Sequence, residues 1–275
     1  MCAAMTDVDE FFDEEHDPAD SPAEDAREVA AAEGLTQLLE ENRTRVFFGR
    51  QLEVKFEREW FHWVTNRALR SLDGGVARID HRMLPNGSPI TLAWHRSYRY
   101  PKRDATRVVD LVAKYSNSVV GHALGERGEH LVLEGFARNQ FVMHGRAVRT
   151  IGDRIWTNSN HDLDFVFERD GRAYGVEVKN TLGYLPKKEF DTKIALARHL
   201  GLAPVFVCRA LPKSWIYELN RAGGFGLVLG WQLYPPTHRE LVDQLRAEFD
   251  LPVDTPRALA EGTMRRFLNW HQRRL

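Results

Sequence analysis

Cysteine is scarce in this sequence. The 275 residues contain only Cys2 and Cys208, which lie far apart, and Cys208 falls in an apolar run typical of a strand. A disulfide framework or a cysteine-based zinc site is therefore not expected. Long apolar runs are missing too, since none approaches the roughly 20 residues of a membrane-spanning helix, and the acidic N-terminus lacks the positive and apolar regions of a secretory signal. The sequence thus predicts a cytoplasmic protein with no membrane partner.

Basic side chains are absent from residues 1–26, which carry ten acidic ones. Although the formal net charge is −1, the rest of the chain holds all 38 Lys and Arg against 29 of the 39 Asp and Glu. A basic body favours a polyanionic partner, because binding to phosphates releases counterions. The acidic segment has too little apolar material to order itself, so we expect disorder there. The simplest role of this acidic segment is to keep the chain solvated, and the alternative is that it shields the basic body.

The N-terminal half contains helices followed by a basic hairpin. Helical periodicity covers about residues 27–48 and 57–72, and two β-like runs follow at 76–84 and 89–98, around the turn Pro85-Asn86-Gly87-Ser88. This order resembles a winged helix-turn-helix, a DNA-binding module. The residues expected to meet phosphates are Arg78, Arg82, Arg96, Arg99, Lys102 and Arg103. Basic and aromatic side chains on an exposed hairpin also occur in protein-binding surfaces, which is the alternative.

Beyond residue 121 helices alternate with strands, which indicates an α/β domain with a mixed sheet. Helices are predicted at 105–115, 128–140, 188–200, 213–222, 238–249 and 258–274, and strands at 162–167, 173–180, 203–209 and 226–234. The predicted organisation is a disordered acidic tail (1–26), a mainly helical, winged-helix-like domain (27–118), an α/β domain (119–236) and C-terminal helices (237–275).

The segment HDLDFVFERDGRAYGVEVKN, residues 161–180, has the pattern of a hairpin. Two β-rich runs flank Asp170-Gly171, a dipeptide that favours a tight turn. With that turn, counting outward along both strands brings Asp164 opposite Glu177, and cross-strand partners share one face. Lys179 lies two residues further on and projects to the same face. The hairpin therefore gathers two carboxylates and a lysine.

Facing carboxylates repel each other unless a cation compensates, and a divalent metal ion is the commonest compensator. Mg²⁺ is the natural candidate, with Mn²⁺ as a substitute, because it favours oxygen ligands, water and phosphate. Asp162 lies opposite Lys179, so the choice of metal-binding aspartate stays open, although the count favours Asp164. The alternative is an exposed acidic hairpin in which Lys179 bridges Asp162 and Glu177 without a metal.

A fourth candidate lies on the helix that begins near Gly128. Glu129 shares a face with Val132, Leu133 and Phe136, at spacings of three, four and seven residues. A carboxylate on an apolar stripe is costly to bury without a partner. A metal ion bound by the hairpin would supply that partner.

These stretches resemble the core of PD-(D/E)XK nucleases, in the branch with archaeal-type Holliday junction resolvases and restriction endonucleases. The matching segments are GERGEHLVLEGF, LDFVF and YGVEVKN, within about residues 121–234. The resemblance implies a restriction-endonuclease-like mixed β-sheet flanked by helices, and a magnesium site made by a helical Glu, an Asp on the second strand, and the Glu and Lys of E-x-K on the third. The residues that take these roles are Glu129, Asp164, Glu177 and Lys179, the three acids as metal ligands. Leu163 replaces the proline that names the family, a substitution the family tolerates. Lys187 and Lys188, just past the third strand, would touch the substrate backbone or lie in a solvated loop.

The function expected from these features is hydrolysis of DNA by a magnesium-dependent endonuclease, with the winged-helix-like region docking the duplex. One alternative is a non-catalytic DNA-binding or regulatory protein built on a nuclease-like scaffold, and another is an interaction protein whose basic body and acidic tail serve assembly. The resemblance also allows a homodimer, since many such nucleases cut both strands as dimers, but the sequence identifies no dimer surface.

Removal of residues 1–26 is expected to tighten DNA binding at low salt, because the segment's ten acidic side chains would no longer compete with phosphates for the basic body. Titration of full-length and shortened protein into labelled duplex DNA at low and high salt measures the effect. Equal affinities would leave the segment with a solvating role only.

Overall fold

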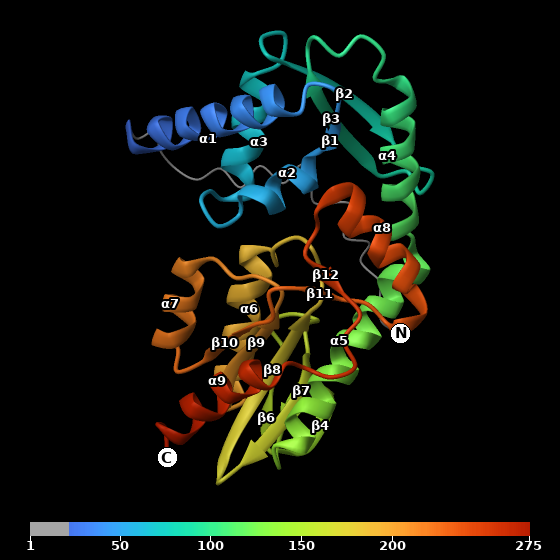
Figure 1. The fold of residues 1–275 in the computed structure, drawn as a ribbon. Helices are drawn as coiled ribbons and strands as arrows, with labels where there is room; N and C mark the ends of the chain where they lie inside the picture. Colours follow the sequence, from blue (N-terminus) through green and yellow to red (C-terminus); the bar gives the residue numbers. More distant parts are fainter. Residues whose placement is uncertain (1–21) are drawn as a thin grey trace. The chain divides into compact units, whose positions relative to one another are not determined.

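The computed structural model describes residues 22–275, and its contacts divide the chain into two units (Figure 1). Unit 1 holds the described residues up to Gly121 together with Asp243–Leu251, and unit 2 holds His122–Val242 and Pro252–Leu275. The predicted C-terminal segment 237–275 is thus shared between both units. Residues 1–21 of the acidic tail lie outside the described part, whereas residues 22–26, also expected to be disordered, belong to the first helix. Among the helices that the structure describes, none combines the length and apolar character needed to cross a membrane.

Unit 1 is a three-stranded antiparallel sheet with helices, in the strand order β1-β3-β2. Its elements are α1 (Pro22–Glu41), β1 (Val46–Phe48), α2 (Gly49–Phe56), α3 (His62–Ser71), β2 (Ala77–Met83), β3 (Pro89–His95) and α4 (Lys102–Tyr115). The predicted hairpin is confirmed, since Met83 pairs with Pro89 and Gly87 takes a φ of 86° in the turn. The helix predicted over 27–48 is wrong beyond Glu41. Its last three residues form buried strand β1, because an aromatic and β-branched run fits a sheet better than a helix.

Unit 2 is built around a five-stranded mixed sheet in the order β10-β9-β8-β7-β4. Its main elements are α5 (Ser118–Arg138), β4 (Val142–Val148), β7 (Leu163–Arg169), β8 (Arg172–Lys179), α6 (Lys187–His199), β9 (Ala203–Cys208), α7 (Lys213–Arg221), β10 (Phe225–Val228) and α9 (Glu261–Gln272). Short pieces complete the unit, namely β5 (Thr150–Ile151), β6 (Arg154–Ile155), β11 (Gln232–Leu233), a 3₁₀ turn (Pro236–His238) and β12 (Val253–Asp254). Helix α8 (Arg239–Phe249) begins in unit 2, but most of it belongs to unit 1. Strand β7 runs antiparallel to both β4 and β8, whereas β8, β9 and β10 run parallel to one another. The predicted α/β class with a mixed sheet is therefore confirmed.

Strand β4 was not predicted from the sequence. It is an edge strand with a single partner, β7, and a bulge between Met143 and Gly145 interrupts their pairing. Val142 is 61% exposed. An edge strand exposed to solvent needs no alternation of apolar and polar residues, so it lacks the pattern by which strands are recognised.

Helices cover both faces of the sheet. On one face, Phe165 and Val176 of the hairpin pack with Phe136 of α5 and Phe267 of α9. On the other face, Val166 of β7 packs with α6, and Phe206 of β9 packs between α6 and α7. Because side chains alternate along a strand, the polar residues of β8 that neighbour Val176 and Val178 point to the α6 face.

The turn at Asp170-Gly171 is confirmed. Both residues have positive φ, 53° and 71°, which a tight hairpin turn of this type requires. The pairing of Arg169 with Arg172 and of Phe165 with Val176 matches the predicted count. Buried His271 of α9 fastens the turn, since its Nε2 lies 3.0 Å from Asp170 Oδ2.

Helix α5 approaches the end of β8 at Gly128. A Cβ at this position would lie 2.8 Å from Asn180 Cβ, closer than side-chain carbons approach each other. Asn180 is buried, and its Nδ2 donates to the carbonyl oxygens of Leu124 at 2.8 Å and Leu233 at 2.6 Å. Glycine is therefore needed for the contact that holds Glu129 beside the sheet.

Substituting Gly128→Ala is expected to lower the free energy of unfolding by about 1–2 kcal/mol, because overpacking against a buried side chain outweighs the gain of about 1 kcal/mol in helix propensity. Gly125→Ala on the same helix is the matched control, since nothing lies within 4 Å of its Cβ position. We expect it to raise stability by about 0.5–1 kcal/mol. Urea unfolding of the full chain measures both, and equal effects of the two substitutions would contradict the close approach at Gly128.

Candidate active site

Glu177 is buried at the end of β8. Its neighbours Val176 and Val178 pack on the α5 face, so Glu177 points to the α6 face, where its side chain is 3% exposed. Lys193 Nζ of α6 lies 2.6 Å from Glu177 Oε2 and forms an ion pair with it. Burial and the nearby Asp164 carboxylate raise the pKa of Glu177 to about 8. The carboxylate thus lies where additional positive charge would stabilise its ionised form.

Asp164 lies where the β7–β8 pairing stops. The last regular pair is Phe165 with Val176, and Asp164 Oδ2 accepts a hydrogen bond of 2.7 Å from the Val178 backbone N–H. The side chain therefore takes the place of a ladder hydrogen bond. Burial raises the pKa of Asp164 to about 6, against the opposing effects of Lys193 and this hydrogen bond. The predicted pair of Asp164 with Glu177 is not part of the regular register, but the charge of Asp164 adds to the rise in the pKa of Glu177, which indicates that the two carboxylates are close.

Lys179 is held between two carboxylates. Its Nζ lies 2.7 Å from Glu189 Oε1 of α6 and 3.7 Å from Glu177 Oε1. Burial acts to lower the pKa of Lys179, but the Glu177 and Glu189 carboxylates outweigh it and raise the pKa above its ordinary value. The side chain is therefore a fixed positive charge.

Lys193 and Glu189 are part of this cluster and were missed from the sequence. They lie four residues apart on α6, so both face β8. Lys193 also donates a hydrogen bond to the Asp162 carbonyl oxygen, and its Nζ lies 3.9 Å from Asp162 Oδ1. One signal was available, because Lys193 occupies an apolar-periodic position between buried Phe190 and Ala197. A lysine in such a position needs a carboxylate partner.

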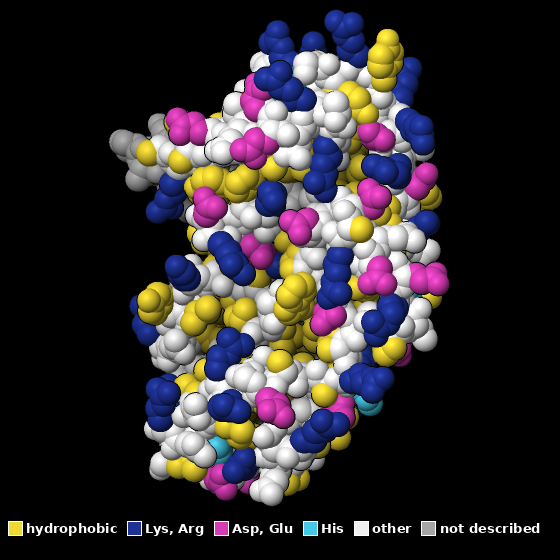
Figure 2. Space-filling model, viewed as in Figure 1, with side chains coloured by type: hydrophobic (Ala, Val, Ile, Leu, Met, Phe, Trp, Pro, Cys, Tyr) yellow, Lys and Arg dark blue, Asp and Glu magenta, His cyan; other side chains and the backbone are white. Residues whose placement is uncertain are grey.

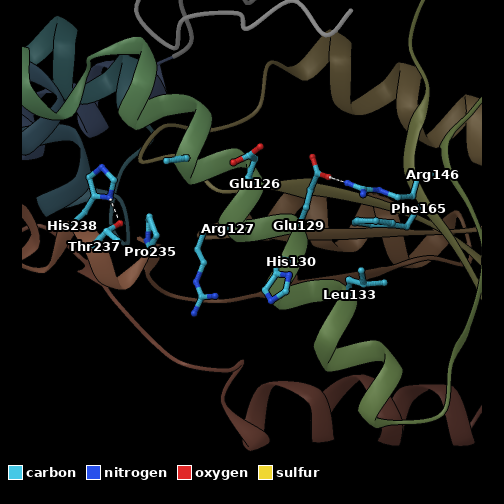
Figure 3. A pocket seen from close by; sticks show the side chains of 11 residues that line it. Glu126, Arg127, Glu129, His130, Leu133, Arg146, Phe165, Pro235, Thr237 and His238 are labelled. Atoms are coloured by element: carbon cyan, nitrogen blue, oxygen red, sulfur yellow. Dashed lines mark hydrogen bonds and ion pairs between the residues drawn. The ribbon is translucent and has the colours of Figure 1, made fainter.

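Glu129 approaches the cluster from the other side of the sheet. Figure 3 shows it on α5 pointing toward Arg146 of β4, whose Nη2 lies 2.7 Å from Glu129 Oε2. Both line an open pocket of about 510 Å³ together with Phe165. The charge of Glu129 adds to the rise in the pKa of Asp164, which indicates that the two carboxylates are close. Glu129 nevertheless has its own counter-ion, Arg146, which the sequence did not reveal.

The chemistry of the cluster suits a divalent cation, although its present arrangement is not a metal cage. The cluster contains five acidic and three basic side chains, a formal excess of two negative charges. The acidic residues are Asp162, Asp164, Glu177, Glu189 and Glu129, and the basic residues are Lys179, Lys193 and Arg146. Carboxylate oxygens are the ligands that Mg²⁺ and Mn²⁺ prefer. Within residues 22–275, however, no three acidic, His or Cys side chains are grouped closely enough to hold a metal ion. Asp164 and Glu177 fit a metal ion as a pair, while Glu129 is engaged with Arg146.

The basic residues proposed to meet nucleic acid differ in their surroundings. Five of the six in unit 1 are exposed, namely Arg78, Arg96, Arg99, Lys102 and Arg103. Arg82 is half-buried, and its Nε lies 2.7 Å from Asp80 Oδ2. In unit 2, Lys188 is exposed, but Lys187 forms ion pairs with Asp191 and Glu218 and is less suited to a phosphate.

In comparisons with known proteins, no family model, no curated protein and no solved structure matches the chain.

Replacing Lys193 with Met, which is similar in shape but uncharged, is expected to lower stability in a pH-dependent way. Lys193 lowers the pKa of Glu177, so that pKa rises above about 8 in the variant. The folded variant then holds a proton that the wild type has released. The deficit in unfolding free energy should therefore be small near pH 6 and grow above pH 8, by about 1.4 kcal/mol per pH unit, toward about 3 kcal/mol.

Urea unfolding in a metal chelator at several pH values measures this deficit. The matched control introduces Lys193→Met into a Glu177→Gln background, where the growth of the deficit above pH 8 should vanish and only the effect of Lys193 on Asp164, whose pKa is about 6, should remain. A deficit independent of pH in both backgrounds would show that Lys193 does not act through Glu177.

Proposed function

We propose that the chain is a metal-dependent nuclease that hydrolyses DNA phosphodiester bonds, with Asp164, Glu177 and Lys179 as its catalytic residues. The observation that carries the proposal is the junction of β7 and β8. There, the buried carboxylate of Glu177 and the half-buried carboxylate of Asp164 come from neighbouring strands and approach each other, and a lysine two residues after Glu177 lies on the same face. Repelling carboxylates with raised pKa values are costly to stability, and perturbed groups of this kind gather at functional sites.

The order of elements in unit 2 supports a restriction-endonuclease-like core. The resemblance to PD-(D/E)XK nucleases implies this order of elements: a helix that carries a Glu, a second strand that carries an Asp, a third strand that carries E-x-K, and then a helix and a strand. Unit 2 has α5 with Glu129, then β4, then β7 with Asp164, then β8 with Glu177 and Lys179, followed by α6 and β9.

Asp164 and Glu177 are the residues that would hold Mg²⁺ or Mn²⁺. When bound, such an ion supplies positive charge that activates water and neutralises a phosphate under attack. Lys179 contributes a second positive charge. Because its pKa is raised, it remains an ammonium ion that orients water or stabilises the developing negative charge, and it does not act as a base.

Unit 1 supports the proposal as a DNA-docking domain of the winged-helix type. Its order α1-β1-α2-α3-β2-β3, with β3 between β1 and β2, agrees with helices followed by a wing hairpin. In Figure 2, Lys and Arg side chains gather along the edge of this unit above β2 and the start of α4, with few acidic side chains between them. Such an edge suits a phosphate backbone.

A non-catalytic DNA-binding protein on the same scaffold is the second candidate. One observation favours it, because within residues 22–275 no three potential ligands form a metal group and the buried charges already have partners. Both candidates would bind DNA, but only the nuclease would cleave it.

The deciding experiment incubates the full chain with linear duplex, single-stranded and branched DNA, in Mg²⁺ or in a chelator. We expect cleavage only with metal, and a fall in rate of about 10²–10³ in Glu177→Ala and in Lys179→Ala. Glu134→Ala, which removes an exposed carboxylate of α5 paired with Arg138, is the matched control and should cleave like the wild type. Binding of DNA without cleavage by the wild type under all of these conditions would favour the non-catalytic candidate.

A further inference from the structure

We propose that Arg146 is an exchangeable counter-ion: a divalent cation competes with it for Glu129, and the released guanidinium binds a phosphate of the DNA backbone. The inference rests on the proposed nuclease function, and it assigns a substrate-positioning role to a residue that the sequence did not single out. It also explains why Glu129 lies close to Asp164 without forming a three-carboxylate metal group.

The Arg146 side chain is held beside Glu129 while it stays largely exposed to solvent. Arg146 and Phe165 are cross-strand partners, and the guanidinium carbon lies 5.3 Å from the centre of the Phe165 ring. The bulge in β4 and the positive φ of Ala147, 50°, flank this position, and irregularities of this kind re-aim a side chain. Figure 3 shows Arg146 lying above Phe165 and reaching to Glu129 at the edge of the pocket.

The exposure of this pair permits exchange. The side chains of Arg146 and Glu129 are 58% and 34% exposed, whereas those of Lys193 and Glu177 are 6% and 3% exposed. An exposed ion pair contributes little net free energy, so a cation with two charges competes well for the carboxylate. A buried pair does not open as readily, because its partners would remain desolvated and unpaired. Glu129 can thus change partner at lower cost than Glu177.

A released Arg146 would lie beside the metal-binding carboxylates with its donors free. Guanidinium groups bind phosphate oxygens through two parallel hydrogen bonds. The pocket in which it lies is open to solvent, so an anionic strand can reach the released guanidinium there. The substrate group that fits this arrangement is a backbone phosphate next to the bond that is cleaved.

The test measures metal binding and DNA binding separately for the wild type and Arg146→Gln. Calorimetric titration with Mn²⁺ in the absence of DNA should show about 2- to 5-fold tighter binding in the variant, since metal entry no longer opens an ion pair. Binding of a short linear duplex in Ca²⁺ should weaken in the variant, and the slope of log affinity against log salt should fall by about 0.9, as for the loss of one phosphate contact.

Arg172→Gln, which changes an exposed arginine at the far end of β8, is the matched control and should leave the Mn²⁺ affinity unchanged. Arg146→Lys retains the charge and should keep a Mn²⁺ affinity close to that of the wild type. Effects of opposite sign on metal and DNA binding are the expected result, because a merely structural role would weaken both.

Unchanged or weaker Mn²⁺ binding in Arg146→Gln, or no Mn²⁺ binding by the wild type, would overturn the exchange. An unchanged salt slope would overturn the phosphate contact. Absent Mn²⁺ binding by the wild type would overturn the metal-dependent nuclease proposal as well. The other failures are distinct from failure of that proposal by a wild type that binds Mn²⁺ and DNA but cleaves nothing.

Discussion

Glu177 must lose its hydration for unit 2 to fold, because it lies beneath α6 and is 2% exposed. An unpaired carboxylate in such a place is costly, and burial alone raises its pKa. The cost is offset by Lys193, itself buried, and by Lys179, which Glu189 holds in turn. None of these charges is tolerable there without the others. The contact between β8 and α6 is therefore specified by charge as well as by apolar packing.

This cluster also determines which end of the hairpin bears the site. Toward Asp170-Gly171 the strands pair regularly and their side chains enter apolar cores. At the other end Asp164 accepts the Val178 N–H and ends the regular pairing, so the strands can diverge. The backbones of β7 and β8 pair completely where the neighbouring side chains are apolar. The pairing ends where a polar side chain, that of Asp164, accepts the hydrogen bond of a backbone N–H. The charged cluster is thereby confined to the end of the sheet next to α5 and α6.

Local features were predictable from the sequence, whereas partners that tertiary packing brings together were not. The Asp170-Gly171 turn and the alternation along β7 and β8 determine the register within a single short segment, and that register is confirmed. Strand β4 lacks alternation because it lies exposed at the sheet edge. Lys193 lies within the helix predicted at 188–200 but was not singled out, although its apolar-periodic position was a usable signal. The contact of Arg146 with Glu129 depends on the pairing of β4 with β7, which no local pattern indicates.

The cluster contains two kinds of ion pair, one on each face of the sheet. On the α6 face the ion pair of Lys193 and Glu177 is buried, and separating it would leave both groups desolvated. On the α5 face the pair of Arg146 and Glu129 is partly exposed, and water can replace either partner. A site that hydrolyses a phosphodiester has to hold its reacting groups still and yet admit an ion and a polyanion. Under the proposed function, the buried pair of unit 2 meets the first requirement and the exposed pair the second, so the rearrangements that accompany binding would belong to the α5 face.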